Sequence, residues 1–165
     1  MHSPSTSFIA PIAPTAGLVV WESDAHWEPH WRRELTAAVP LVAVRHVDDA
    51  WARLQRWPHG ALAVELSQTQ APQTIALLAR IQAELPSILC VVHLPADLAD
   101  WELLVREAGA TLIVRSPWQL TVTAPQLSRH FGRAPQPAVS FREEIWHRLP
   151  WSESASTTLH PTTEN

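Results

Sequence analysis

The sequence predicts an α/β protein with a doubly wound sheet of five parallel strands. Short runs of residues that are apolar on both faces recur along the chain, as is typical of strands buried within a parallel sheet. Segments with apolar residues at helical spacing alternate with these runs. The chain has 165 residues, and 46% of them are hydrophobic, which fits one globular domain.

The strands are expected at the apolar runs, in the order in which these occur along the chain. They comprise residues 17–21, 41–44, 61–64, 88–92 and 111–114. No uninterrupted apolar run is longer than that from Ile88 to Val92, which is far too short to cross a bilayer. Right-handed crossovers between these strands give a sheet of the flavodoxin type.

Helices are expected between the strands, where apolar residues recur every three or four positions. The stripes are Trp27, Trp31, Leu35 and Ala38; Val47, Ala50, Trp51, Leu54 and Trp57; Ile75, Leu78, Ile81 and Leu85; and Leu98, Trp101, Val105 and Ala108. Pro29 suits a first helical turn, and Gly109 suits the end of the fourth helix. A fifth helix is expected roughly from Pro125 to Phe131.

The composition excludes several kinds of chemistry. All 12 basic residues are Arg, and the chain has no Tyr, one Cys and nine Trp. Without Lys there is no Schiff base and no phosphate-loop lysine, and without Tyr there is no phenolic acid or base. A lone Cys90, which we expect to be buried, excludes an intrachain disulfide and a Cys-rich zinc site. A net charge of −4 without a basic block argues against nucleic-acid binding.

The two ends of the chain differ in composition from its middle. Residues 1–16 are rich in Ser, Thr and Pro, and we expect a flexible N-terminal tail there. Pro11 and Pro14 interrupt its apolar stretch, which is not typical of a secretory signal, so the expected location is the cytoplasm. The α/β domain itself is expected over residues 17–133.

A second apolar segment follows the domain. We expect a Pro-rich linker at 134–139, a short amphipathic helix at 140–151 and a disordered polar tail at 152–165. Ser140 and Glu143 fit a capping box. The apolar set of this segment comprises Ile145, Trp146, Leu149 and Trp151. Because so short a helix is not stable alone, it must pack either on its own domain or on a protein partner.

Two short motifs flank the fifth expected strand. The segment from Glu107 to Ala110 reads Glu-Ala-Gly-Ala, and Ser116-Pro117-Trp118 follows the strand. Together with the order of strands and helices, these motifs make residues 17–132 resemble a bacterial response-regulator receiver domain. The resemblance implies a cis peptide bond between Ser116 and Pro117.

The resemblance also implies a phosphorylation site at the carboxyl ends of the strands, with most of its positions altered here. The family has two acidic Mg²⁺ ligands after the first strand, a phosphoacceptor Asp after the third, Ser or Thr after the fourth and Lys after the fifth. The corresponding residues are Trp21 and Glu22 (with Asp24 as an alternative), Glu65, His93 and Ser116. We therefore expect a degenerate receiver that is not phosphorylated by the usual route and has no catalytic turnover.

The function that we expect is a protein-interaction or scaffold module in bacterial signalling. By the resemblance, Trp118 lies on the face of the fourth helix, fifth strand and fifth helix, which receivers use for dimers and partners. The partner-binding candidates are therefore Trp118 and the apolar set of residues 140–151, and the partner is a protein, including a second copy of this chain. No membrane contact is expected.

The alternative function is a small-molecule or cofactor sensor that binds at the carboxyl edge of the sheet. Asp24-Ala-His26 resembles the start of the Asp-x-His-x-x-Gly cobalamin motif, although Pro29 stands in place of its Gly. Asp24, His26 and Glu65 are also secondary candidates for holding Mg²⁺ or another metal. A metal-assisted enzyme that uses Glu22, Asp24 and Glu65 with His26 or His93 is a third reading, whereas the first reading needs no cofactor.

Overall fold

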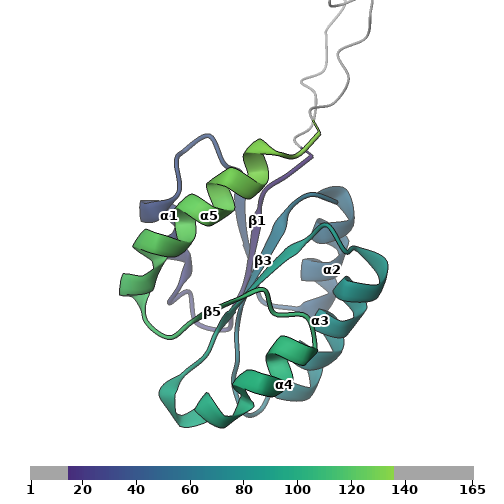
Figure 1. Ribbon diagram of the computed structural model, residues 1–165, viewed down its shortest axis with the longest axis vertical. Helices are drawn as coiled ribbons and strands as arrows, with labels where there is room; N and C mark the ends of the chain where they lie inside the picture. Colours follow the sequence, from purple (N-terminus) through teal and green to yellow (C-terminus); the bar gives the residue numbers. More distant parts are fainter. Residues whose placement is uncertain (1–14, 136–165) are drawn as a thin grey trace, which may run out of the picture.

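The computed structural model describes residues 15–135, which form one five-stranded sheet covered by helices on both faces (Figure 1). The strands are β1 Leu18–Trp21, β2 Leu41–Val44, β3 Ala61–Glu65, β4 Leu89–His93 and β5 Leu112–Val114. They are all parallel and follow the order β2-β1-β3-β4-β5. This order is that of a flavodoxin-type sheet, so the predicted fold class is confirmed.

The helices divide into two layers. They are α1 Glu28–Glu34, α2 Val47–Arg56, α3 Ala71–Glu84, α4 Glu102–Glu107 and α5 Leu120–Gly132, with short 3₁₀ turns η1 Ala96–Trp101 and η2 Pro117–Gln119. α1 and α5 pack side by side on one face of the sheet, whereas α2, α3 and α4 cover the other (Figure 1).

Each face of the sheet has its own apolar core. Successive residues of β1 point to opposite faces: Val19 and Trp21 belong to the core under α2 and α3, and Leu18 and Val20 to the core under α1 and α5. The strand residues are therefore apolar throughout, because neither face is open to water. The single Cys90 is buried in the first core, as predicted.

Three of the expected helices have different bounds in the structure. α1 ends at Glu34, so Ala38, which was expected on its apolar stripe, is exposed. The fourth helix is divided, because Leu98 in η1 has non-helical angles (φ −109°, ψ 16°). α5 begins at Leu120 rather than near Pro125, which lies inside the helix. Proline at a helix start is common, and this favoured the wrong boundary.

The prediction of a cis bond between Ser116 and Pro117 was wrong, because no cis peptide bond occurs within residues 15–135. Ser116 is extended (φ −151°, ψ 154°), which is the conformation preferred before proline. Pro117 then begins the 3₁₀ turn η2. Its fixed φ suits the first position of such a turn.

The two ends of the described part of the chain lie together. Thr15 Oγ1 donates a hydrogen bond to the carbonyl oxygen of Pro135 at 3.1 Å. Residues 1–14 of the tail predicted at 1–16, residues 136–139 of the predicted linker, and the predicted segments 140–151 and 152–165 lie outside the described residues. Among residues 15–135, no helix is both long and apolar enough to cross a membrane.

Candidate functional site

The candidate site lies at the carboxyl edge of the sheet, where neighbouring strands end. Trp21 is the last residue of β1, Glu65 of β3 and His93 of β4. Glu65 and His93 are also direct partners in the ladder between β3 and β4. Ser116 follows β5 and is half-buried. The fold thus places the residues predicted for a degenerate phosphorylation site at the ends of four strands.

Glu22 is committed to a structural role at this edge. Its Oε2 accepts a hydrogen bond from the backbone N–H of Trp27 at 2.6 Å, and its Oε1 accepts one from that of Glu28 at 2.9 Å. The side chain is buried, with 4% exposed. These bonds satisfy two backbone donors at the start of α1, where the helix dipole also favours a negative charge. Glu22 is the one residue that keeps the acidic character of the Mg²⁺ ligands, and both of its carboxylate oxygens are engaged.

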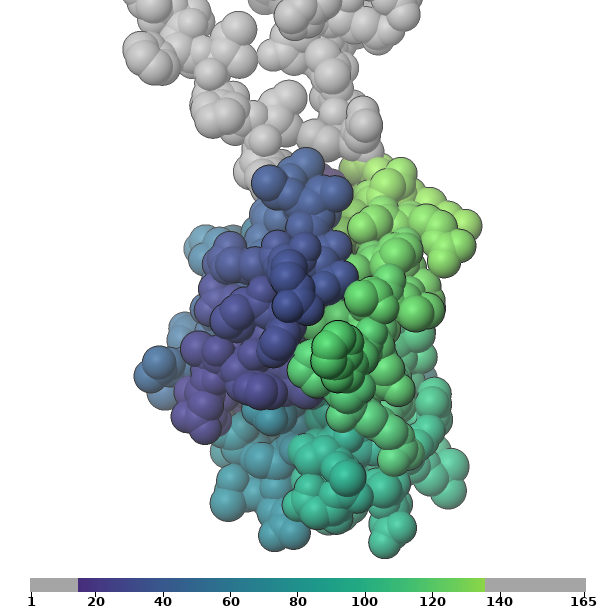
Figure 2. All heavy atoms as spheres, turned by 90° about the vertical axis from the view of Figure 1, so that its left-hand side faces the viewer, coloured from purple at the N-terminus to yellow at the C-terminus, as the bar shows by residue number. Residues whose placement is uncertain are grey.

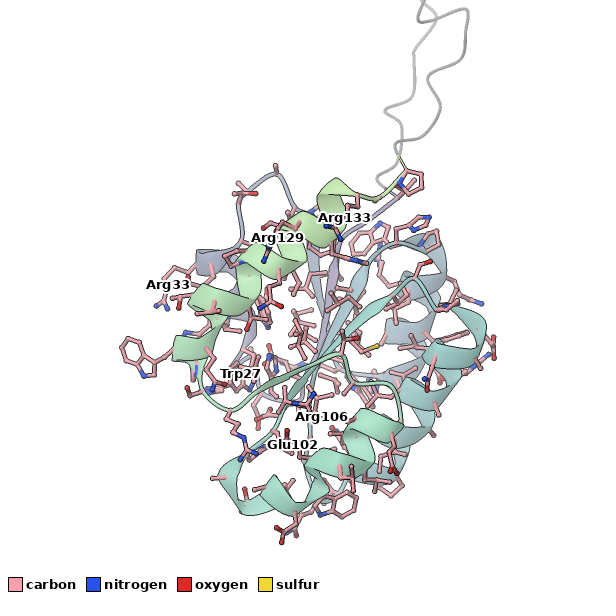
Figure 3. The ribbon with its side chains drawn as sticks, in the orientation of Figure 1. Trp27, Arg33, Glu102, Arg106, Arg129 and Arg133 are labelled. Carbon is pink, nitrogen blue, oxygen red and sulfur yellow. The ribbon has the colours of Figure 1, made fainter. Side chains whose placement is uncertain are left out.

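His93 fills the position at which receivers have Ser or Thr, and two tryptophans cover it. The imidazole is completely buried and stacks on Trp27, with ring centroids 3.8 Å apart and planes at 6°. On another side, Trp31 Nε1 donates a hydrogen bond to His93 Nε2 at 3.1 Å. Both tryptophans come from α1 or its N-cap, so this helix closes the edge above β4. Trp27 is labelled in Figure 3.

Burial keeps His93 neutral. Burial is the larger cause, and a positive charge on His26 the smaller one, of a pKa that is lowered from 6.5 to about 3. Because Nε2 accepts the bond from Trp31, the proton of the neutral ring lies on Nδ1. Within residues 15–135, neither this Nδ1 nor the buried Nε1 of Trp27 has a hydrogen-bond partner.

The metal-ligand candidates do not form a cluster. Asp24 and His26 are exposed in the loop after β1, and the ring of His26 packs edge-on against Trp27 with centroids 5.4 Å apart. Glu65 is half-buried at the end of β3. Within the part of the chain that the structure describes, no three His, Cys, Asp or Glu residues come together as a possible metal site. Asp24, His26 and Glu65 are thus not assembled for coordination.

A second surface feature lies around the edge strand β5. Trp118 in η2 is 83% exposed. The other large exposed apolar side chains of the described region are Leu103 and Leu104 on α4 and Val122 on α5. We call these four residues the β5-edge surface. All of them belong to the elements directly before and after β5.

An ion-pair network lies beside this surface. Glu102 on α4 accepts hydrogen bonds from Arg106 and from Arg115, which follows β5. Glu102 and Arg106 are labelled in Figure 3. The hydrogen bond from Arg106 is the largest cause of a lowered pKa at the Glu102 carboxyl, and the bond from Arg115 is the next largest. The network therefore ties α4 to the chain that leads into η2.

Comparison with known proteins relates this arrangement to solved structures. No family model matches the sequence, and neither does any curated protein. A response regulator from Thermotoga maritima matches the structure with a TM-score of 0.54 and 14% identity, over 71% of this chain and 98% of that one. The chain has the fold of a response-regulator receiver domain. An orphan response regulator of H. pylori matches similarly, with a TM-score of 0.52 and 14% identity, over 70% of this chain and 96% of that one.

The way in which the receiver-like edge is closed was not predicted from the sequence. Trp27 and Trp31 were expected on the inner stripe of a helix, and both are buried as predicted. Their packing on His93, which lies 62 residues beyond Trp31 in the chain, was not expected. The available signal was the pair of indoles, four positions apart, directly after the loop that ends β1. Periodicity gives the face of a helix, but not which strand end that face meets.

Proposed function

We propose that this chain is a non-catalytic, receiver-like module of bacterial signalling that acts by binding a protein partner. The observation that carries the proposal is the state of the Glu22 carboxylate, both of whose oxygens accept backbone hydrogen bonds from α1. Mg²⁺ binding there would compete with these bonds for the carboxylate oxygens and weaken the hold of Glu22 on the start of α1. A cytoplasmic location is part of the proposal.

The remaining receiver positions support the same conclusion. Glu65 is one methylene longer than the Asp that accepts phosphate in the family, and no Lys exists anywhere in the chain. His93 is buried under Trp27 and accepts a bond from Trp31, so its ring does not face an incoming phosphoryl group. The site therefore lacks the phosphoacceptor Asp, a pocket for Mg²⁺, and the Ser or Thr and the Lys that respond to the phosphoryl group.

Phosphorylation of the purified protein tests this part of the proposal. We expect no Mg²⁺-dependent gain of a phosphoryl group on incubation with acetyl phosphate, measured by intact-protein mass spectrometry. Glu65→Asp restores the chemistry of the acceptor but not the neighbouring groups, so we expect it to stay unmodified as well. Modification of wild type at Glu65 would overturn the non-catalytic reading. Modification of Glu65→Asp alone would contradict the argument that Glu22 and His93 close the site.

The β5-edge surface is the proposed interaction face. Trp118 is the best single anchor because exposed tryptophans often dominate binding energies when a partner covers them. The partner that binds this face is either a different protein or a second copy of the chain. The apolar set of residues 140–151, with Trp146 and Trp151, supplies further candidate contacts.

Self-association and partner capture test this face. Sedimentation equilibrium and affinity capture from the native host are compared for wild type, Trp118→Ser and the control Gln73→Ser, which changes an exposed residue of α3 on the other face. We expect Trp118→Ser to weaken binding by about 30-fold, as for a hot spot of about 2 kcal/mol, and the control to bind normally. Equal binding by all three proteins would refute the proposed face.

A second candidate function, a ligand sensor at the carboxyl edge, rests on one observation. The buried Nδ1–H of His93 and Nε1–H of Trp27 have no acceptor within residues 15–135, and unpaired buried donors are uncommon. A ligand with a hydrogen-bond acceptor can satisfy them. A thermal-shift screen with Mg²⁺, Zn²⁺, cobalamin and nucleotides tests this, and a stabilisation that His93→Gln abolishes would favour the sensor. No shift with any of these probes would count against it.

A further inference from the structure

The outward side of α5 and its two flanks carry a stripe of residues that are exposed, apart from the half-buried Gln126. Trp118, Val122, Gln126, Arg129 and Arg133 follow one another at intervals of three or four, so they share a face of the helix. The start of this α5 stripe is apolar, with Trp118 83% and Val122 68% exposed, and its end is basic. Figure 2 looks onto one side of the molecule, where α5, in green, lies beside α1. Figure 3 labels the two arginines.

The basic end of the α5 stripe has no acidic partner in the described part of the chain. Residues 120–132 contain no Asp or Glu. The ion pairs within residues 15–135 involve neither Arg129 nor Arg133. Arg129 donates only to the backbone carbonyl of Pro125, at 3.3 Å. Two positive charges of α5 are therefore available to acidic groups from elsewhere.

The chain itself continues from this end of α5. Beyond Pro135, residues 140–151 begin with Ser140, Phe141 and Arg142, and Glu143 and Glu144 then precede the apolar set that ends with Trp151. The two acids of this segment thus come before most of its apolar residues. Along α5 the order is apolar and then basic. An antiparallel pairing of the two helices places the acids near the arginines and Trp151 near Val122.

The dimensions allow this pairing. At 1.5 Å per residue, α5 rises about 16 Å from Val122 to Arg133, and a helix from Glu143 to Trp151 rises about 12 Å. The linker at 134–139 is of the length that joins antiparallel helices, which is about 2–8 residues. The segment can therefore lie back along the helix that it follows.

We propose that residues 140–151 dock as a helix on the α5 stripe of their own chain and cover Val122. This inference rests on the proposed function in one respect: the docked segment and a protein partner then compete for the β5-edge surface, to which Val122 belongs. A partner must displace the segment to bind there. Covering Val122 also removes an exposed apolar side chain from water, which favours the docked form.

Disulfide trapping tests the docked geometry in the full chain. The native Cys90 does not interfere, because burial raises the pKa of its thiol to about 12. The test protein carries Val122→Cys and Leu149→Cys, and the control carries Gln73→Cys, on the opposite face, with Leu149→Cys. Under mild oxidation we expect an internal disulfide in the test protein, seen as faster migration of a monomer without reductant, and none in the control.

The alternatives give different products. Covalent dimers in place of the internal disulfide would show that the segment binds a second copy, and would overturn docking on its own chain. Trapping no stronger than in the control would overturn docking altogether. Val122 is largely exposed, so its substitution leaves the fold intact. This readout needs no partner, and it can therefore fail while Trp118-dependent binding succeeds, or succeed while that binding fails.

Charge reversal provides a second, independent measurement. In the trapping protein, Arg129→Glu with Arg133→Glu should reduce the rate of disulfide formation about two- to fivefold, as expected for exposed ion pairs. Adding Glu143→Arg with Glu144→Arg should restore it, because the pairs are then reversed rather than lost. Failure of the second exchange to restore the rate would contradict the antiparallel alignment of charges.

Discussion

The buried His93 makes the stability of this domain sensitive to mild acid. Burial lowers the pKa of the imidazole to about 3 in the folded protein, whereas the ordinary value is 6.5. Between these two values the unfolded chain binds a proton at this residue and the folded protein does not. The free energy of unfolding must therefore decrease as the pH falls below 6.5. The loss continues until the pH approaches 3.

The size of the effect follows from the shift. Each pH unit within this window is equivalent to about 1.4 kcal/mol for one titrating group. Lowering the pH from 7.5 to 5.0 crosses about 1.5 units of the window, so we expect His93 to account for a loss of about 2 kcal/mol. Carboxyl groups add their own dependence. The contribution of His93 is therefore the difference between wild type and His93→Gln, which cannot titrate in this range.

Urea unfolding followed by far-UV circular dichroism at pH 7.5, 6.0 and 5.0 measures this difference. We expect the free energy of unfolding of wild type to fall about 2 kcal/mol further than that of His93→Gln between the two extremes. In NMR spectra, the ring protons of His93 should not titrate above pH 4. Equal pH dependence in the two proteins would refute the reasoning, because it would mean that the native imidazole binds its proton near the ordinary pKa.

Further predictions concern the helix cap, the glycines and the thiol. Glu22→Gln should lower the free energy of unfolding by about 1–2 kcal/mol, because it weakens two charge-assisted bonds to α1; unchanged urea stability would contradict this. Gly17→Ala should cost about 1–3 kcal/mol, since its Cβ would lie 2.8 Å from the Pro40 carbonyl, whereas Gly132→Ala, with nothing within 4 Å, should cost nothing in the same thermal melts. Cys90 should react with Ellman's reagent at pH 8 only after denaturation, because burial raises its pKa to about 12; rapid native reaction would show an open thiol.

The sheet could be predicted closely from the sequence because its strands are buried on both faces. Leu41–Val44 is bounded by Pro40 and by charged residues, and the predicted bounds agree with β2. Helix ends were less predictable. Pro125 was taken as a start, although the upstream residues from Leu120 pack their inner side against the sheet and extend the helix. Tertiary packing at Leu120 and Ala124 outweighs the local signal of the proline.

The candidate site could be predicted only as a set of positions. The ends of β1, β3 and β4 follow from the pattern, so Glu22, Glu65 and His93 were placed at the right edge. What each side chain does there depends on contacts between distant parts of the chain. The stacking of His93 on Trp27 and the turn of Glu22 toward α1 require the crossing of α1 over the sheet, which no local spacing encodes.

The hydrogen bond between Thr15 and Pro135 has a consequence for how such a domain can be joined to other proteins. The two ends of the described region are within hydrogen-bonding distance of each other. The domain therefore suits insertion into a host chain at the position of a short loop, because it enters and leaves at nearly the same point. It can be inserted between two neighbouring residues of a host surface turn without forcing them apart. Any segments attached at both ends leave from one point, so fluorescent labels placed there should report high energy transfer in the folded state and a sharp loss on unfolding.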